Sequence, residues 1–150
     1  MQRSLSHKKS LTPLIYVALF VIYESLSSIY LFLPPLLGVL FLLFMNSLKK
    51  EDTMAFFLVA FCLLIFESEK GYLLFSTIIY FGIIYKFVLP KLKQNFNCNT
   101  CINISIVLLA YIGFYFFNVL MSTVFLLPLV GISYYIIYYI VIEFLIVSVL

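Results

Sequence analysis

The sequence predicts an all-α integral membrane protein, a bundle of about six transmembrane helices joined by short loops. Of its 150 residues, 65% are hydrophobic and only 10% are charged, and the mean hydropathy is +1.20. This leaves too little polar surface to cover a water-facing domain. The same composition excludes a disordered chain, and a net charge of +3 from scattered basic residues argues against a nucleic-acid-binding protein.

Six apolar segments are candidate membrane spans. A membrane-crossing helix needs about 20 mostly apolar residues, and somewhat shorter ones are accommodated by a locally thinner bilayer. After an N-terminal tail at residues 1–10, a single helical domain at 11–150 contains predicted spans at 11–33, 34–48, 53–66, 71–89, 102–121 and 127–150. Because the break at 122–128 is nearly apolar, a five-span arrangement with a kink at Pro128 and Gly131 is an alternative.

The first apolar segment is expected to remain in the mature protein. It follows basic residues, as a signal peptide does, but it is longer than a signal-peptide core and carries Glu24. Pro34 and Pro35 then prevent the helix from continuing, because proline lacks an amide donor and disfavours helical geometry in the preceding residue. We therefore expect a tight hairpin between the first two helices.

The positions of the basic residues predict the orientation of the chain in the membrane. With six spans and the N-terminus inside, eight of the nine basic residues fall on the cytoplasmic side, and only Lys70 falls outside. The eight are Arg3, Lys8, Lys9, Lys49, Lys50, Lys86, Lys91 and Lys93. Both termini are therefore predicted to be cytoplasmic. A composition without Trp and rich in Phe, Ile and Tyr suits an AT-rich bacterial coding sequence, so we expect the bacterial cytoplasmic membrane.

Four residues inside predicted spans are candidate functional residues, because ionisable groups there are costly and usually face a helix interface or cavity: Glu24, Lys86, Asn118 and Glu143. Glu24 is either a proton or cation site, or a neutral carboxyl group hydrogen-bonded within the bundle or to a partner's helix. Lys86 and Glu143 are predicted at comparable depths, so an ion pair between them is a hypothesis.

Neither a metal site nor a cofactor site is expected. Cys98 and Cys101 have the spacing of a metal half-site or a redox pair, but a structural zinc site needs four ligands. Cys62 is predicted within a span, and the only histidine is His7 in the N-terminal tail. We therefore interpret Cys98 and Cys101 as part of a solvated cytoplasmic loop.

The chain is also not expected to be an enzyme, because it has no Ser/His/Asp set and no Gly-rich phosphate loop. Tyrosines at four-residue spacing instead place hydroxyl groups along stripes of the sixth helix. These are Tyr134, Tyr135, Tyr138 and Tyr139. Such stripes either pack and anchor the helix at the membrane interface or form a docking face for another protein.

The overall plan resembles the MreD family of bacterial rod-shape-determining membrane proteins. Like those proteins, the chain is short and has minimal loops, short second and third spans, and proline just after the first span, where Pro34 and Pro35 fill this role. Glu67 and Gly71 look like the family's acidic residue and first glycine, whereas Phe75 stands where a second glycine is usual. The resemblance covers most of the chain as a plan but few positions as a motif.

This resemblance implies a non-catalytic scaffold that supports cell-wall elongation and rod shape by binding other membrane proteins. Its partners would be an MreC-like protein, the actin-like MreB filament, and the wall polymerase and transpeptidase. Glu67 and Gly71 would then shape an outer turn that contacts a partner. The alternative is a small transporter, or the substrate-binding membrane subunit of one, in which Glu24 and Asn118 face a common cavity.

Overall fold

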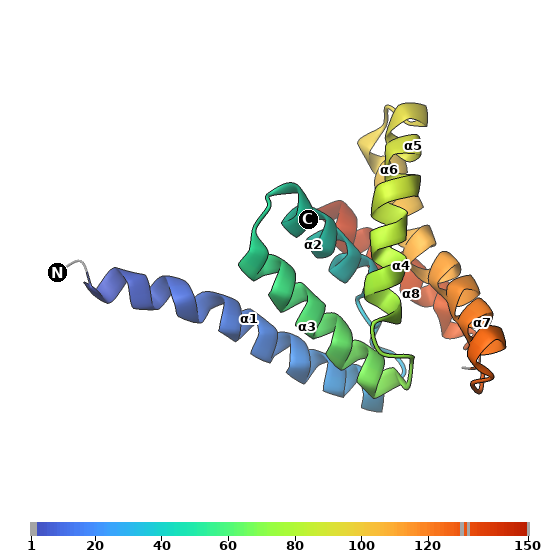
Figure 1. The fold of residues 1–150 in the computed structure, drawn as a ribbon, viewed down its shortest axis with the longest axis horizontal. Coiled ribbons are helices and arrows are strands. Elements are labelled where there is room, and N and C mark those ends of the chain that lie inside the picture. The colour runs from blue at the N-terminus through green and yellow to red at the C-terminus, as the bar shows by residue number, and fades with distance from the viewer. Residues whose placement is uncertain (1–2, 130, 132, 150) are drawn as a thin grey trace.

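The computed structural model describes residues 3–129, 131 and 133–149, which form helices and no β-strand. The helical segments are α1 (Arg3–Ile29), α2 (Leu37–Lys49), α3 (Thr53–Lys70), α4 (Ser76–Ile83), η1 (Ile84–Val88), α5 (Leu89–Asn95), α6 (Asn99–Leu108), η2 (Leu109–Gly113), α7 (Phe114–Phe125) and α8 (Tyr135–Val149). The segments α4, η1 and α5 form one continuous helix, and α6, η2 and α7 form another. The described residues therefore contain six continuous helices, as the sequence predicts (Figure 1).

The helices differ from the predicted spans mainly at their ends. The third was predicted to end at residue 66, but α3 continues to Lys70, where Gly71 adopts the left-handed conformation (φ 72°) that commonly ends helices. The last helix starts at Tyr135 instead of residue 127, because Leu126 ends α7 with φ 54° and Pro128 follows. This break divides the last apolar stretch into two helices, so the five-span alternative does not describe the fold.

The first two helices do not form the tight hairpin that Pro34 and Pro35 predict. A seven-residue connection, 30–36, separates α1 from α2, and α1 packs chiefly against α3. The connection folds back on α1, where the Tyr23 hydroxyl donates to the Pro34 carbonyl (2.7 Å) and the Ser27 hydroxyl donates to the Leu33 carbonyl (3.1 Å). The first helix was predicted at 11–33, but α1 already begins at Arg3 and ends at Ile29, before the prolines. Side chains of α1, and not a short turn, fix the path that follows.

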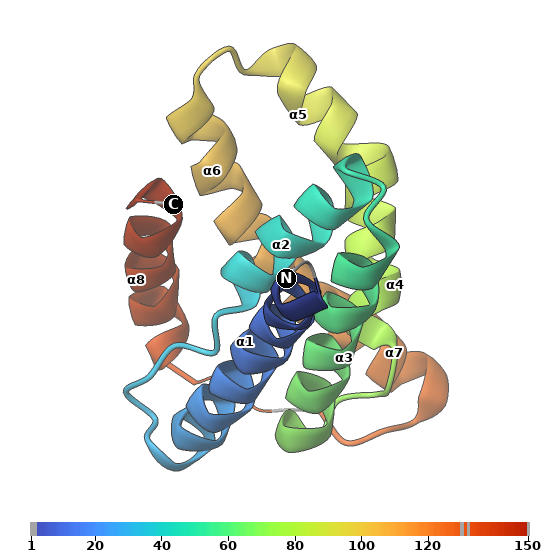
Figure 2. The ribbon, with the colours of Figure 1, turned by 90° about the vertical axis from the view of Figure 1, so that its left-hand side faces the viewer.

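Helix α2 lies at the centre of the fold. It packs against α3, α6, η2 and α8, and the Phe41 and Phe44 rings contact the Phe81 ring of α4 at centroid distances of 4.6 and 5.9 Å. Figure 2 shows α6 and α8 on one side of α2, and α3 and α4 on the other. The core is therefore built around α2, whereas α1 lies at its edge and extends its N-terminal half beyond the other helices (Figure 1).

The two π-helical turns lie in the long helices that flank this core. A π-turn changes the register of the backbone hydrogen bonds and occurs often where a helix meets a special contact. Here the Tyr80 hydroxyl of α4 donates to the Leu109 carbonyl of η2 (2.7 Å). A Cβ atom on Gly113 would lie only 2.0 Å from that hydroxyl oxygen. Glycine at this position therefore permits the close crossing of the two helices.

Consecutive connections lie at alternate ends of the fold. The connections α2–α3 and α5–α6 lie at one end in Figure 1, and the connections α3–α4 and α7–α8 lie at the other. Lys49 and Lys50 consequently share an end with Lys91 and Lys93, whereas Lys70 lies at the opposite end. This is the separation of lysines on which the predicted membrane orientation depends.

One described helix is long and apolar enough, by length and composition, to cross a membrane. It is the continuous helix Asn99–Phe125. The apolar helices Pro13–Ile29, Leu37–Lys49 and Tyr135–Val149 are shorter. More large hydrophobic side chains are exposed in the described chain than are buried in its core, so much of this apolar surface is left for lipid or other proteins to cover.

Candidate functional site

Three of the six acidic residues have completely buried side chains. They are Glu24 on α1, Glu67 on α3 and Glu143 on α8, each with 0% of its surface exposed. Burying a carboxylate is strongly unfavourable unless hydrogen bonds or an opposite charge compensate for the lost water. The hydrogen-bond partners of each carboxyl group therefore indicate whether its role is structural.

Glu67 holds the beginning of α4. Its carboxylate accepts hydrogen bonds from the amide of Phe75 (2.6 Å) and the amide of Thr77 (2.5 Å), and from the hydroxyls of Ser76 and Thr77. Phe75 offers no side-chain cap to this helix, so Glu67 supplies one from α3. A carboxylate is favourable at a helix N-terminus because the unpaired amides carry partial positive charge.

Glu143 performs the same task at the beginning of α2. Its carboxylate accepts from the Gly38 amide (2.5 Å) and from the Tyr111 hydroxyl of η2. A Cβ atom on Gly38 would lie 2.5 Å from the nearer carboxylate oxygen, so only glycine allows this approach. Because Leu36 provides no side-chain cap, α2 depends on a carboxylate more than 100 residues away in the sequence.

Glu24 differs from the other two buried carboxyl groups. Neither of its oxygens has a hydrogen-bond partner among the described residues, although both are completely buried. The hypothesis that it is hydrogen-bonded within the bundle therefore finds no partner in the described fold. A buried, unpaired carboxyl group is favoured in its neutral, protonated form.

The other predicted intramembrane residues lie apart from these carboxylates. The exposed Lys86 ammonium lies 5.9 Å from the Phe87 ring centroid, whereas Glu143 is occupied by Gly38 and Tyr111, so the hypothesised Lys86–Glu143 pair is not formed. The Asn118 amide donates to the Phe114 carbonyl one turn earlier (3.0 Å). Asn118 also lines a cavity, and Glu24 does not.

The predicted partner-contact residues divide into inward-facing and outward-facing groups. Glu67 leaves no surface for a partner, whereas Gly71 is exposed. Tyr134 is fully exposed and Tyr135 is 46% exposed. The two remaining tyrosines contact the α1–α2 connection: the Tyr138 ring packs against Phe32 at 5.0 Å, and the Tyr139 hydroxyl donates to the Leu31 carbonyl.

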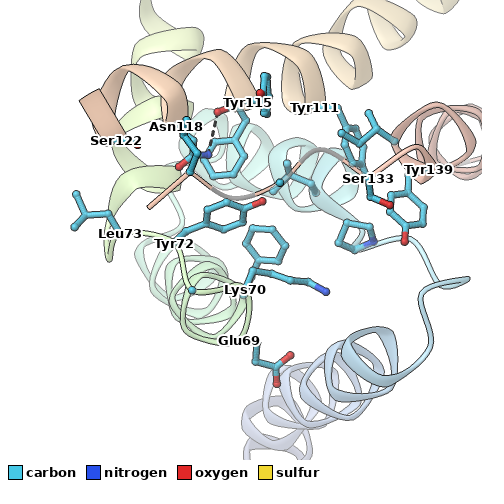
Figure 3. Close-up of a pocket in the computed structure, with 18 of the residues that line it drawn as sticks. Glu69, Lys70, Tyr72, Leu73, Tyr111, Tyr115, Asn118, Ser122, Ser133 and Tyr139 are labelled. Carbon is cyan, nitrogen blue, oxygen red and sulfur yellow. Dashed lines mark hydrogen bonds between the residues drawn. The ribbon is translucent and has the colours of Figure 1, made fainter. Parts of the chain in front are cut away.

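A cavity of about 610 Å³ opens between α1, α3, α7 and α8, at the end of the fold that contains Lys70 (Figure 3). Its walls include the aromatic side chains of Phe66, Tyr72 and Phe114. Polar side chains also reach it, from Glu69, Lys70, Tyr115, Asn118, Ser122, Ser133 and Tyr139. Its volume lies in the range of cavities that hold small molecules.

The cysteine pair lies at the start of α6, at the opposite end of the fold from this cavity (Figure 1). Cys98 is exposed, and both Cys98 and Cys101 are free thiols. The neighbouring Cys101 lowers the pKa of the Cys98 thiol. No group of three or more metal-ligating side chains occurs in the part of the chain that the structure describes.

Sequence reasoning missed several features of this arrangement. It treated Lys70 only as a topology marker, although Lys70 and Tyr72 lie on the cavity wall. The order Glu-Lys-Gly-Tyr at the end of an apolar segment could have indicated this position of Lys70 and Tyr72. A helix that ends at Gly71 directs its last side chains toward the neighbouring helix ends. Comparison with protein-family models, with curated proteins and with solved structures finds no match.

Proposed function

We propose that this chain is a non-catalytic membrane scaffold of the MreD type, which supports cell-wall elongation and rod shape by binding other membrane proteins. It would lie in the bacterial cytoplasmic membrane as a six-helix bundle with both termini in the cytoplasm. The alternating connections and the separation of Lys70 from the remaining lysines of the loops support this placement.

The short helix α2 is compatible with a membrane bundle because of the way it begins. Its 13 residues span about 20 Å, less than the roughly 30 Å hydrocarbon core. A helix that starts inside the membrane needs partners for its first amides, since lipid offers none. Glu143 supplies such a partner at Gly38, so α2 begins within the protein and not at the membrane surface.

One observation carries the scaffold proposal: α1 presents an apolar stripe that no other helix covers. The stripe repeats at alternating spacings of four and three residues, through Ile15, Leu19, Ile22, Leu26 and Ile29, each at least 42% exposed. This spacing is typical of the seam by which two α-helices pack side by side. The opposite side of α1, with Val17, Phe20 and Glu24, faces the rest of the fold.

The stripe fits a transmembrane helix of a partner protein, in keeping with the membrane-protein partners that the family resemblance implies. Packing between membrane helices depends on close van der Waals contact, which a continuous row of Ile and Leu side chains provides. The N-terminal half of α1 extends beyond the bundle, so a partner helix has room to lie along it (Figure 1).

Photocrosslinking in the native host tests this proposal. A photoreactive phenylalanine analogue at Leu19 or Ile22 should give a discrete crosslinked protein, identified by mass spectrometry as a membrane protein of wall elongation. The control is the same analogue at Leu120 on α7, which is similarly exposed but lies outside the stripe. Equal crosslinking from all three positions, or none from the stripe, would contradict the scaffold proposal.

The second candidate is a substrate-binding membrane subunit of a transporter, which the cavity of about 610 Å³ favours. Asn118 lies on its wall as this hypothesis expects, but Glu24 does not. The two candidates differ in a simple measurement. A transporter subunit would be needed for uptake of a solute, whereas deletion of a scaffold would alter cell shape and leave uptake unchanged.

A further inference from the structure

The cavity between α1, α3, α7 and α8 contains one cation, Lys70, which forms no salt bridge among the described residues. Lys70, the last residue of α3, extends into the cavity in Figure 3, between Tyr72 and the connection that precedes α2. The adjacent Glu69 points instead toward α1, where it accepts a hydrogen bond from the Ser25 hydroxyl (3.3 Å). Glu24, within electrostatic range of Lys70, is not part of the cavity wall.

The uncommitted polar groups of the cavity wall can donate hydrogen bonds. Several hydroxyl groups of the wall already donate within the chain: Tyr111 to Glu143, Tyr139 to Leu31 and Ser122 to Leu127. The hydroxyls of Tyr72 and Tyr115 have no hydrogen-bond partner among the described residues. The Asn118 amide nitrogen uses one of its two hydrogens on the Phe114 carbonyl. The cavity thus offers the positive charge of Lys70 and hydrogen-bond donors that include Tyr72, Tyr115 and Asn118, while the Glu69 carboxylate turns toward α1.

The remaining wall is apolar and aromatic. The Tyr72 ring packs against Phe66 at 5.8 Å and against Phe114 at 5.2 Å, which fixes one continuous aromatic surface beside the Lys70 ammonium. Leu31, Leu73 and Val119 extend this apolar surface. The wall therefore suits a molecule that is largely apolar and carries a hydrogen-bond acceptor beside Lys70.

From this arrangement we infer that the cavity binds an amphipathic anion, a molecule with one carboxylate or phosphate group on an apolar body. The acidic group pairs with Lys70 and accepts a hydrogen bond from Tyr72. Tyr115 and Asn118 offer further donors across the cavity, and the apolar body lies against Phe66 and Phe114. Hydrogen bonds between charged groups are about twice as strong as neutral ones, so the charge determines the selectivity. This inference concerns a ligand of the purified chain and does not depend on the scaffold proposal.

A photoreactive fatty acid provides the test. The purified protein, in nanodiscs of neutral phosphatidylcholine, is illuminated with a 16-carbon fatty acid that carries a diazirine, or with the methyl ester of the same acid. The labelled peptides are identified by mass spectrometry. The acid should label the cavity wall saturably and at least tenfold more than the ester, because the ester has no charge to pair with Lys70. Equal labelling by acid and ester, or labelling that does not saturate, would overturn the inference.

Two variants and a matched control connect the result to Lys70. Lys70→Gln should remove the preference for the acid, whereas Lys86→Gln, which alters an exposed lysine outside the cavity, should retain it. Tyr72→Phe keeps the aromatic wall and removes one donor, so it should weaken labelling by the acid severalfold even if Lys70→Gln fails to fold. A Lys70→Gln protein with an unchanged melting temperature and an undiminished preference for the acid would overturn the assignment.

To identify the natural ligand, the protein is purified from its host and the small molecules bound to it are extracted. Mass spectrometry of the extract separates a free fatty acid, an anionic phospholipid and other anions that carry an apolar body. Enrichment of any one of these over the Lys70→Gln protein supports the inference and names the source. An extract in which no anion is enriched would contradict it.

Discussion

The beginning of α2 and the middle of α1 both contain a completely buried glutamate, but only the first is satisfied by its own chain. Glu143 accepts hydrogen bonds from Gly38 and Tyr111, whereas Glu24 has no partner among the described residues. The central helix α2 is thus held by internal hydrogen bonds, whereas the peripheral helix α1 carries a buried carboxyl group without a hydrogen-bond partner among the described residues. This contrast teaches that hydrogen bonds to a distant side chain hold the start of α2, whereas side-chain packing against α3 holds α1.

The largest effect is expected from removing the satisfied carboxylate. Glu143→Leu leaves the Gly38 amide and the Tyr111 hydroxyl buried without an acceptor, which should lower the free energy of unfolding by about 3 kcal/mol. Denaturation of the detergent-solubilised protein, followed by circular dichroism, measures this change. Glu143→Gln keeps one carbonyl acceptor and should cost clearly less. A Leu variant as stable as the wild type would show that α2 needs no cap.

A somewhat smaller loss is expected at the second capped helix. Glu67→Ala removes the acceptor for two amides and two hydroxyls at the start of α4, and should cost about 2 kcal/mol. The cost is lower because Phe75 is exposed, so water can replace part of the lost interaction. The melting temperature of this variant, followed by circular dichroism, is compared with that of Glu69→Ala, which alters an exposed glutamate. Equal melting temperatures for the two variants would contradict the capping role.

Gly71→Val tests the turn between these two helices. A β-branched residue in the left-handed conformation at φ 72° should cost about 1–2 kcal/mol and reduce co-purification with partners. Gly82→Ala is the control, because Gly82 has no positive φ and a Cβ atom there meets nothing within 4 Å. If Gly71→Val retains both stability and partner co-purification, the turn has no specific role.

The smallest change in stability is expected at Glu24, and measuring it tests the contrast between Glu24 and Glu143 directly. Since its carboxyl group has no partner to lose, Glu24→Leu should change the unfolding free energy of the isolated protein by less than about 1 kcal/mol, or increase it. The same denaturation experiment applies to this variant. A loss as large as that of Glu143→Leu would mean that Glu24 is satisfied within the chain, and the contrast between the two helices would disappear.

The features that depend on neighbouring residues were predicted from the sequence. The number of helices follows from the apolar runs, and the ends near Pro34 and Lys50 follow from proline and charge. The spacing of the α1 stripe is also visible in the sequence, but only the fold shows that the opposite side faces α3. The sequence alone cannot distinguish the side of α1 that packs within the fold from the side that stays exposed.

Features that depend on distant residues were not predicted. The Glu143–Gly38 contact joins residues 105 positions apart, and no local pattern relates a carboxylate on the last helix to the first turn of the second. The hairpin expected at Pro34 and Pro35 was wrong for the same reason, because hydrogen bonds from Tyr23 and Ser27 decide the path of that connection. The cavity wall likewise assembles the ends of four helices that the sequence keeps far apart.

The most direct test of the scaffold proposal is cell shape, observed by phase-contrast microscopy while this protein is depleted in its native host. One culture re-expresses the wild-type chain, and another re-expresses a chain with charged residues in the α1 stripe, Leu19→Glu and Ile22→Glu. We predict that depleted cells lose their elongated form and round up before growth stops, and that only the wild-type chain restores shape. Cells that keep their shape through depletion would contradict the proposal.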